Sequence, residues 1–445
     1  ESELQEGLIY VGTDDGVINI TEDGGKSWSR TTRFAGVPDM TYVDDVQASM
    51  HDVNVVYAVM ENHKRGDNKP YVLKSTNKGK SWKSIASNLP TNGFAHTIAE
   101  DHIDPNLLFL GTEQGVFVTQ NGGKSWTQMR NNLPTIAVRD IEIQRRENDL
   151  VVGTFGRGIY IVDDYSPLRT QARDLGAFQL FAPRDPWLFI EGGVWGGVEK
   201  GSIGHAFFTA PNPEFGAVFR YYVKDGSKTK RQIRRTAEIA IENEGGDTPY
   251  PSWDALRAED RERGDALYIL VRDANGQLVR QISAKSGGGL HQTAWDLRLP
   301  APDPVSIKTS GSRPYWASDP AGPLALPGLY SASLALERDG TIKTLGEPQS
   351  FTVKALDNSV EITDDRRALQ DFQVKVAGLQ RAVKGAVRSM SELDNRVAHL
   401  RATLPVTLAS SDADLDAVGQ LEARLADLEV TLRGDRTRST RNEPS

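Results

Sequence analysis

The side chains of this 445-residue sequence that could do chemistry are charged groups at strand starts and in the turns between strands. We expect one face of a repeat structure to present nine of them: Asp14, Asp15, Asp44, Asp45, His96, Glu113, Arg139, Asp140 and Arg157. Paired carboxylates act as acid and base in glycoside hydrolysis when their separation suits the stereochemistry. The candidates for that chemistry are Asp14, Asp15, Asp45, Glu113 and Asp140. Alternatively, the nine side chains form a binding face or are solvated loop charges, as most surface charges are.

The composition argues against several classes of site. There are no cysteines, so disulfides and thiolate metal sites are excluded. The seven histidines are scattered without a pair at helical metal spacing, and we predict no metal site among them. The successive acidic pairs are compatible with calcium, although spacing alone does not define an oxygen cage, and no other cofactor is expected. The net charge of −8 gives no basic footprint for nucleic acid, and no apolar run is long enough to cross a membrane.

An eight-residue pattern that occurs three times must position these groups. Its copies start at Thr21, Ser75 and Thr119, which are 54 and 44 residues apart, and periods of this size indicate a repeat architecture such as a propeller. In each copy an Asp or Asn accepts backbone N–H groups across a tight turn, and a glycine supplies the positive φ that the turn needs. A tryptophan ends each copy and is expected to pack between neighbouring units. We assign structural roles to six of these residues: Asp23, Trp28, Asn77, Trp82, Asn121 and Trp126.

These three copies resemble the Asp-box, or BNR repeat, of sialidase-like and sortilin-like β-propellers. The resemblance implies that each box lies on an outer hairpin of a blade, away from the central channel where ligands bind. It also implies a bacterial protein outside the cytoplasm. Sialidase catalysis needs an arginine cluster and a tyrosine nucleophile, and the sequence offers only Arg139 and Arg157 toward that set.

The repeats predict about four blades within residues 1–165. The first blade begins at its second strand, residues 8–11, so its innermost strand is missing, and a fourth box near residues 162–165 has lost its Gly and Trp. Strands are also predicted at 17–21, 43–50, 55–60, 71–75, 107–111, 116–119, 138–143, 150–153 and 159–162, with a polar insertion at 61–69. An open arc exposes sheet faces. We therefore expect the chain to be the C-terminal part of a longer polypeptide, with further blades supplied by an N-terminal segment or a second chain.

The remaining sequence predicts two more domains. A connector at 166–201 leads to an immunoglobulin-like or fibronectin-like sandwich at 202–355, with strands at 206–209, 218–223, 266–271, 278–282, 293–298, 329–337 and 349–353 and a short helix at 253–263. The basic stretch 228–235 is interpreted as an exposed strand or loop. Apolar residues at steps of three and four predict an antiparallel helical hairpin within 356–434, whose second helix starts at the Ser411/Asp414 capping box. A polar tail follows at 435–445.

Two functions fit this organisation. The first is a non-catalytic binding or scaffold protein outside the cytoplasm, whose propeller face recognises a peptide, protein or glycan within a larger assembly. The second is a glycoside hydrolase similar to the Asp-box xyloglucanase-like enzymes, with a cleft shared with the further blades. Two carboxylates facing each other across an open cleft would favour the hydrolase.

Overall fold

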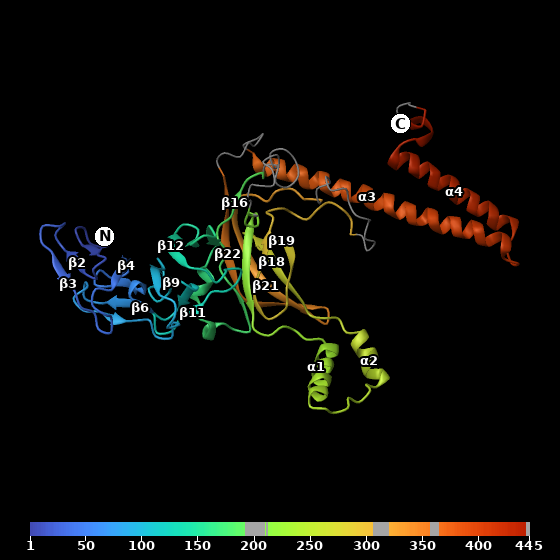
Figure 1. The fold of residues 1–445 in the computed structure, drawn as a ribbon. Helices are drawn as coiled ribbons and strands as arrows, with labels where there is room; N and C mark the ends of the chain where they lie inside the picture. The colour runs from blue at the N-terminus through green and yellow to red at the C-terminus, as the bar shows by residue number, and fades with distance from the viewer. Residues whose placement is uncertain (192–209, 211, 306–319, 357–364, 442–445) are drawn as a thin grey trace. The chain divides into compact units, whose positions relative to one another are not determined.

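The computed structural model describes residues 1–191, 210, 212–305, 320–356 and 365–441 (Figure 1). It comprises two compact units, Glu1–Ala177 and Phe178–Ser445. The predicted fold class is confirmed: the chain is mainly β, with propeller blades, a sandwich and a C-terminal helical hairpin. The strand expected at 206–209 lies outside the described residues.

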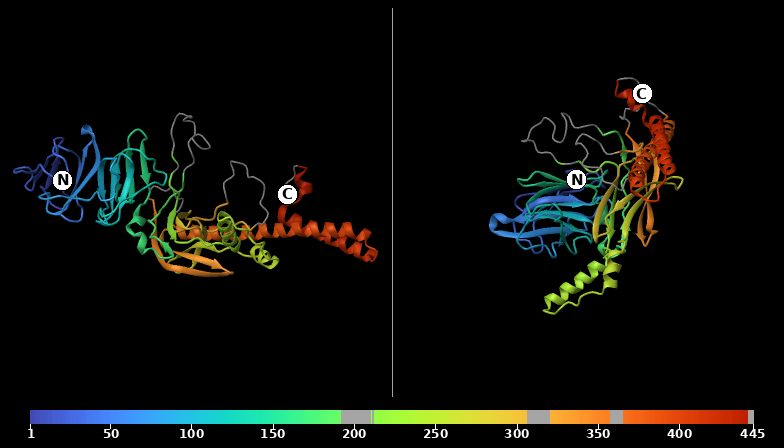
Figure 2. Two further views of the ribbon diagram at one scale, coloured as in Figure 1. Left: turned by 60° about the horizontal axis from the view of Figure 1, so that its bottom comes forward. Right: turned by 90° about the vertical axis from the view of Figure 1, so that its right-hand side faces the viewer.

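The first unit is a partial β-propeller of four successive antiparallel sheets, which follow one another from blue to green in Figure 2. Blades 1 and 2 contain β1 (Ile9–Gly12), β2 (Ile18–Thr21) and β3 (Ser29–Thr31), then β4 (Tyr42–Ala48), β5 (Val56–Asn62), β6 (Asp67–Ser75) and β7 (Lys83–Ser84). Blades 3 and 4 contain β8 (Ala95–Glu100), β9 (Leu108–Thr112), β10 (Gly115–Thr119) and β11 (Thr127–Gln128), then β12 (Val138–Gln144), β13 (Asp149–Thr154) and β14 (Ile159–Val162). The innermost strands β4, β8 and β12 contact one another in that order. In blade 1, the first strand β1 takes the second-strand position, as expected.

The segment 61–69 is not wholly an insertion, because it extends the hairpin of blade 2. Asn62 at the end of β5 pairs with Asp67 at the start of β6. A single 3-10 turn, His63–Arg65, connects the two strands and ends on Gly66, which has a φ of 77°. Part of the predicted insertion is therefore regular structure that projects from the strand ends.

The three boxes form the same hydrogen-bonded turn. Ser27 donates its backbone N–H to Asp23 over 2.9 Å and its hydroxyl to the other carboxylate oxygen over 2.6 Å. In the second box, Asn77 accepts the Ser81 N–H over 2.9 Å. The amide oxygen of Asn77 therefore accepts the same backbone hydrogen bond as the carboxylate of Asp23. In the first box, the bonds from Ser27 and Thr21 lower the pKa of Asp23 to about 2.

Two of the three box tryptophans, Trp82 and Trp126, pack against the blade that precedes their own. Trp126 is only 4 % exposed, lies in the core cluster that contains Val55 and Tyr57 of blade 2, and donates its indole N–H to the Ile85 carbonyl over 2.8 Å. Trp82 makes an edge contact with Phe34, with ring centroids 5.8 Å apart. Trp28, in blade 1, is 49 % exposed. The burial of each ring therefore depends on the presence of a preceding blade.

Two consecutive buried carboxylates, one at the end of the inner strand of blade 3 and one directly after it, connect the blades. Glu100 accepts hydrogen bonds from the Ser49 hydroxyl (3.0 Å), the Met50 N–H (2.8 Å) and the Tyr57 hydroxyl (2.9 Å), all in blade 2. Asp101 accepts bonds from Arg169 and from the Tyr165 hydroxyl, which follow blade 4. Burial would raise the pKa of Asp101, but the bonds from Arg169 and Tyr165 outweigh it and lower that pKa.

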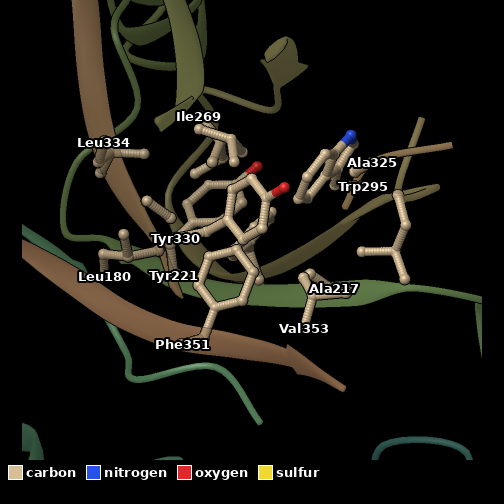
Figure 3. Packing of buried hydrophobic residues seen from close by; sticks show 14 of the residues in the cluster. Leu180, Ala217, Tyr221, Ile269, Trp295, Ala325, Tyr330, Leu334, Phe351 and Val353 are labelled. Carbon is tan, nitrogen blue, oxygen red and sulfur yellow. The ribbon is translucent and has the colours of Figure 1, made fainter. Parts of the chain in front are cut away.

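The second unit contains a sandwich of two sheets with one shared core (Figure 3). One sheet has the order β15 (Phe178–Leu180), β17 (Ala217–Val223), β20 (Gly289–Trp295). The other has the order β16 (Trp187–Leu188), β22 (Thr341–Ala355), β21 (Gly328–Arg338), β18 (Ala266–Asp273), β19 (Leu278–Ala284). Trp295, Tyr330 and Phe351 pack together at its centre. Strands β15 and β16 arise from the segment predicted as a connector.

Helices complete the second unit. The interpretation of 228–235 as a strand or loop is wrong: Thr229 and Gln232 form a capping box that starts α1 (Lys230–Asn243), and α2 (Trp253–Asp260) follows. The hairpin consists of α3 (Arg366–Thr403) and α4 (Asp412–Arg433), and Asp414 accepts the Ser411 N–H as its capping box requires. A four-residue helix, α5 (Arg436–Ser439), lies in the polar tail. None of the helices in the described ranges has an apolar stretch suited to crossing a bilayer.

The tryptophan positions give a matched stability test. We expect Trp126→Ala to lower the free energy of unfolding by about 3–5 kcal/mol, because it opens a cavity between two blades. We expect Trp28→Ala to cost much less, since its ring is half exposed. Urea denaturation followed by circular dichroism measures both changes. Equal losses in free energy of unfolding for the two variants would contradict the claim that burial of each tryptophan ring depends on a preceding blade.

Candidate functional site

Four of the nine charged side chains named from the sequence meet at one end of the inner strands. We call Asp44, His96, Glu113 and Arg139 the strand-end cluster. His96 Nδ1 lies 2.9 Å from Asp44 Oδ2, and Nε2 lies 2.9 Å from Glu113 Oε1. Arg139 pairs with the same Glu113 oxygen over 3.2 Å and approaches His96 Nδ1 to 3.1 Å. His96 is only 3 % exposed, whereas the side chains of Glu113 and Arg139 reach solvent.

A repeated backbone irregularity aims three of these side chains. The innermost strands of blades 2, 3 and 4 each have a register shift near their start. At each shift one residue has no partner on the adjacent strand, and these residues are Asp44, His96 and Arg139. A β-bulge of this kind bends the strand and redirects a side chain. Because the bulge recurs at equivalent positions of adjacent blades, it brings together residues that are 52 and 43 positions apart in the sequence.

A glycine on the neighbouring strand lets the bulged strands approach. Gly111 lies in β9, and a Cβ added there would lie 2.8 Å from the carbonyl oxygen of Val138, the residue before the blade 4 bulge. Gly12 in β1 has the same relation to Val43, whose side chain lies 2.4 Å from the position of an added Cβ. These glycines are therefore needed for close blade packing beside the site.

The residue after each bulge points elsewhere, as expected for neighbours on a strand. Asp45 accepts the Ile98 N–H (2.9 Å) and the Thr97 hydroxyl (3.1 Å) of blade 3. Burial raises the pKa of Asp45, and the negative charges of Asp140 and Asp44 add to the increase. Asp140 accepts the N–H of its neighbour Ile141 over 3.0 Å.

The remaining predicted residues do not join the cluster. Asp14 and Asp15 lie in the exposed turn between β1 and β2, where Asp15 accepts the Thr13 hydroxyl. Arg157 is exposed in the turn between β13 and β14. These three side chains belong to two turns, and the hydrogen bonds of the described residues do not connect them to His96.

Glu61 and His63 were not predicted as site residues from the sequence, because both lie in the segment interpreted as a polar insertion. Glu61 is 7 % exposed, and its carboxylate lies 2.7 Å from His63 Nδ1. The Phe94 ring stacks on the His63 ring, with centroids 4.8 Å apart, and contacts the His96 ring edge-on, with centroids 4.9 Å apart. Within the part of the chain that the structure describes, Asp44, Glu61 and His96 form a group that could hold a metal ion, with ligand atoms all within 4.8 Å of one another. The sequence signal that could have identified Glu61 is its position directly after the apolar run 55–60.

An exposed aromatic ring borders the cluster. Phe155 is 67 % exposed, and the Arg139 guanidinium lies 5.4 Å from its ring centroid. The Phe155 N–H bonds to the Ala137 carbonyl, which fixes the turn beside the start of β12. An arginine and an aromatic side chain presented together are typical of binding surfaces.

The chemistry open to this arrangement is mainly ionic recognition. Both ring nitrogens of His96 contact carboxylates, and Glu113 is also paired with Arg139. His96 is therefore already engaged on both sides and is poorly placed to move a proton to a substrate. The carboxylate with a raised pKa, Asp45, is bonded to the backbone of the next blade.

Comparisons with known proteins return only distant similarity. No family model and no curated protein match the sequence. Solved structures with similarity include YCF48 bound to D1 peptide, at 18% identity and a TM-score of 0.30, covering 37% of this chain and 50% of that one. A GH74 xyloglucanase from Xanthomonas campestris shows 16% identity and a TM-score of 0.32, covering 78% of this chain and 44% of the enzyme. PorZ of Porphyromonas gingivalis shows 12% identity and a TM-score of 0.24, covering 79% and 50%.

This chain thus spans about half the length of each of these three proteins. At such identities and TM-scores, the assignment of the fold depends on the sheets of this chain itself.

The raised pKa of Asp45 predicts a pH effect on stability. The folded protein holds this proton more tightly than the unfolded chain, so the contribution of Asp45 to the free energy of unfolding falls as pH rises above 3.8 through the raised value. We expect Asp45→Asn to remove this fall, because an asparagine amide does not titrate in this pH range. The variant should still fold, since the amide oxygen can accept the Ile98 N–H.

Urea denaturation between about pH 4 and 7 compares the variant with the wild type. Asp14→Asn, at an exposed carboxylate, is the control. The assignment of a raised pKa to Asp45 would be contradicted if the free energies of unfolding of the wild type and of Asp45→Asn differed by the same amount at every pH.

Proposed function

We propose that this chain is a non-catalytic binding or scaffold protein whose propeller face recognises a peptide, protein or glycan within a larger assembly. The strand-end cluster and Phe155 form the recognition surface. The observation that carries the proposal is the double engagement of His96 by Asp44 and Glu113, which leaves the histidine as a fixed part of a charged network. The resemblance of the Asp-boxes to sortilin-like repeats supports a location outside the cytoplasm.

The exposed members of the surface suit a polar ligand with an apolar part. Arg139 offers guanidinium donors that match a carboxylate or a carbonyl. Phe155 offers an exposed face on which a sugar ring or an aromatic side chain can pack. Glu113 is partly exposed and accepts hydrogen bonds from ligand N–H or hydroxyl groups.

We further propose that additional blades, in the same polypeptide or in a second chain, complete the ring. Three observations support this. Trp28 has no preceding blade to bury it, although the equivalent Trp126 is buried. Strand β1 occupies a second-strand position and pairs on one edge only. On the last blade, Ile159 and Ile161 are both exposed. Each of these features is at one end of the arc, where a neighbouring blade would cover it.

A glycoside hydrolase is the second candidate. It is favoured by one observation, the raised pKa of Asp45 beside the charges of Asp140 and Asp44. A carboxyl group with a raised pKa is what a general acid needs. The hydrogen bonds from Ile98 and Thr97 argue against it, because they occupy the group within the fold.

The binding proposal predicts a loss of affinity on removal of Arg139. The 445-residue chain is applied to a glycan array and a random-peptide array, and the best binder from each is titrated. We expect Arg139→Ala to weaken binding about tenfold or more, since it removes the exposed cation of the surface. The matched control is Arg146→Ala, which removes an exposed arginine paired with its neighbour Glu147 at the far end of β12.

Equal weakening by both variants would contradict the assigned surface. Cleavage of a glycan by the wild type, abolished in Asp45→Asn, would replace the binding proposal with the hydrolase.

Ring completion predicts a pattern of amide hydrogen exchange. In the isolated chain, the β1 amides that do not bond to β2 should exchange at the rate of open edges, whereas those of β5, which is paired on both sides, should be protected. Addition of the blades that complete the ring should protect the β1 edge. Strong protection of the whole of β1 in the isolated chain would show that no further blade is needed.

A further inference from the structure

The donor atoms beside the strand-end cluster have the composition of a metal site. Asp44 and Glu61 offer carboxylate oxygens and His96 offers a ring nitrogen, and these atoms lie within 4.8 Å of one another. Three protein ligands with an open position are the usual set for an exchangeable zinc ion. The three residues come from adjacent strands of two blades, β4 and β5 of blade 2 and β8 of blade 3.

The other ring nitrogen of His96 is already arranged as in many metal sites. Nε2 lies 2.9 Å from Oε1 of Glu113, which is hydrogen-bonding distance from that carboxylate. A metal-ligating histidine almost always donates its second N–H to a carboxylate or carbonyl, which orients the ring and raises its basicity. Glu113 is therefore a positioning residue that directs Nδ1 toward Asp44 and Glu61.

The carboxylate of Asp44 and the ring nitrogen Nδ1 of His96 are close enough to share one ion. The two atoms are 2.9 Å apart. A metal ion beside them would bind the carboxylate oxygen and the ring nitrogen together. The buried carboxylate of Glu61 lies close to the same atoms, and an ion there would offset the charges of two carboxylates, Asp44 and Glu61, together.

Other charged groups face the same point. Arg139 lies 3.1 Å from Nδ1 and competes with a metal ion for that nitrogen; its exposed side chain is also paired with Glu113. His63 contacts Glu61 at 2.7 Å and leaves the second carboxylate oxygen of Glu61 for the ion. Asp45 is directed to the next blade and takes no part.

We propose that Asp44, Glu61 and His96 bind one divalent transition-metal ion, with Glu113 orienting the histidine. The mixed nitrogen and oxygen set favours zinc-like ions over calcium and magnesium, which take oxygen ligands in larger numbers. This inference goes beyond the proposed function, because the ion binds in the absence of any peptide or glycan.

Isothermal titration of the metal-free 445-residue chain with Zn²⁺ tests the proposal. We expect one saturable site, with Kd below about 10 µM. Asp44→Asn and Glu61→Gln, which remove a charge at constant shape, should each weaken binding at least about tenfold. Glu113→Gln should weaken binding about 10–100-fold while Zn²⁺ still shifts the His96 ring resonances in NMR spectra. The controls are His399→Gln and Asp14→Asn, which alter exposed residues elsewhere and should bind as the wild type does.

Thermal unfolding provides a second readout. Zn²⁺ should raise the Tm of the wild type and of both controls, and should leave the Tm of Asp44→Asn and Glu61→Gln nearly unchanged. If the buried Glu61→Gln variant does not fold, the exposed Asp44→Asn variant decides alone. Absence of a saturable site, or affinities of Asp44→Asn and Glu61→Gln equal to that of the wild type, would overturn the proposal whatever ligand the propeller face binds.

Discussion

The geometry of the propeller unit depends on buried carboxylates that reach from one blade to the next. Glu100 accepts three hydrogen bonds from blade 2, and Asp101 accepts bonds from Arg169 and Tyr165 after blade 4. A buried charge is tolerated only when its hydrogen bonds are satisfied, and removing one partner is strongly destabilising. Each carboxylate therefore joins separate blades at defined distances and in a defined register. That register is what allows residues on separate inner strands to meet.

The strand-end cluster follows from this register and from a repeated bulge. Asp44, His96 and Arg139 occupy the bulged position in successive blades. Because the same bulge recurs in each of these blades, side chains from three separate strands meet at one site. The cluster is strongly ionic and partly buried. Its exposed rim, formed by Arg139 and Phe155, suits recognition, while its buried side, with Glu61 and His96, has the donor groups for a metal ion. Both proposals therefore derive from one structural device.

The sequence predicted the regular parts of this structure well, because apolar alternation and the box turns are local signals. It also named Asp44, His96, Glu113 and Arg139, although as members of a larger set. It could not select them, since a bulge is a property of strand pairing; the one trace is two adjacent non-aliphatic residues between aliphatic ones, as in Val43–Val46 and Ala95–Ile98. Glu61 was missed because an extended hairpin has the same polar composition as an insertion. The helix at Lys230 was missed although Thr229 and Gln232 are a local capping signal.

The central claim is that buried carboxylates fix neighbouring blades in register. A double-mutant cycle between Tyr57 and Glu100, whose hydroxyl and carboxylate are 2.9 Å apart, tests this claim most directly. The free energies of unfolding of Tyr57→Phe, Glu100→Gln and the double variant are compared with that of the wild type. The account predicts a coupling energy of about 0.5–3 kcal/mol, as found for residues in one hydrogen-bond network. Strictly additive effects would contradict it.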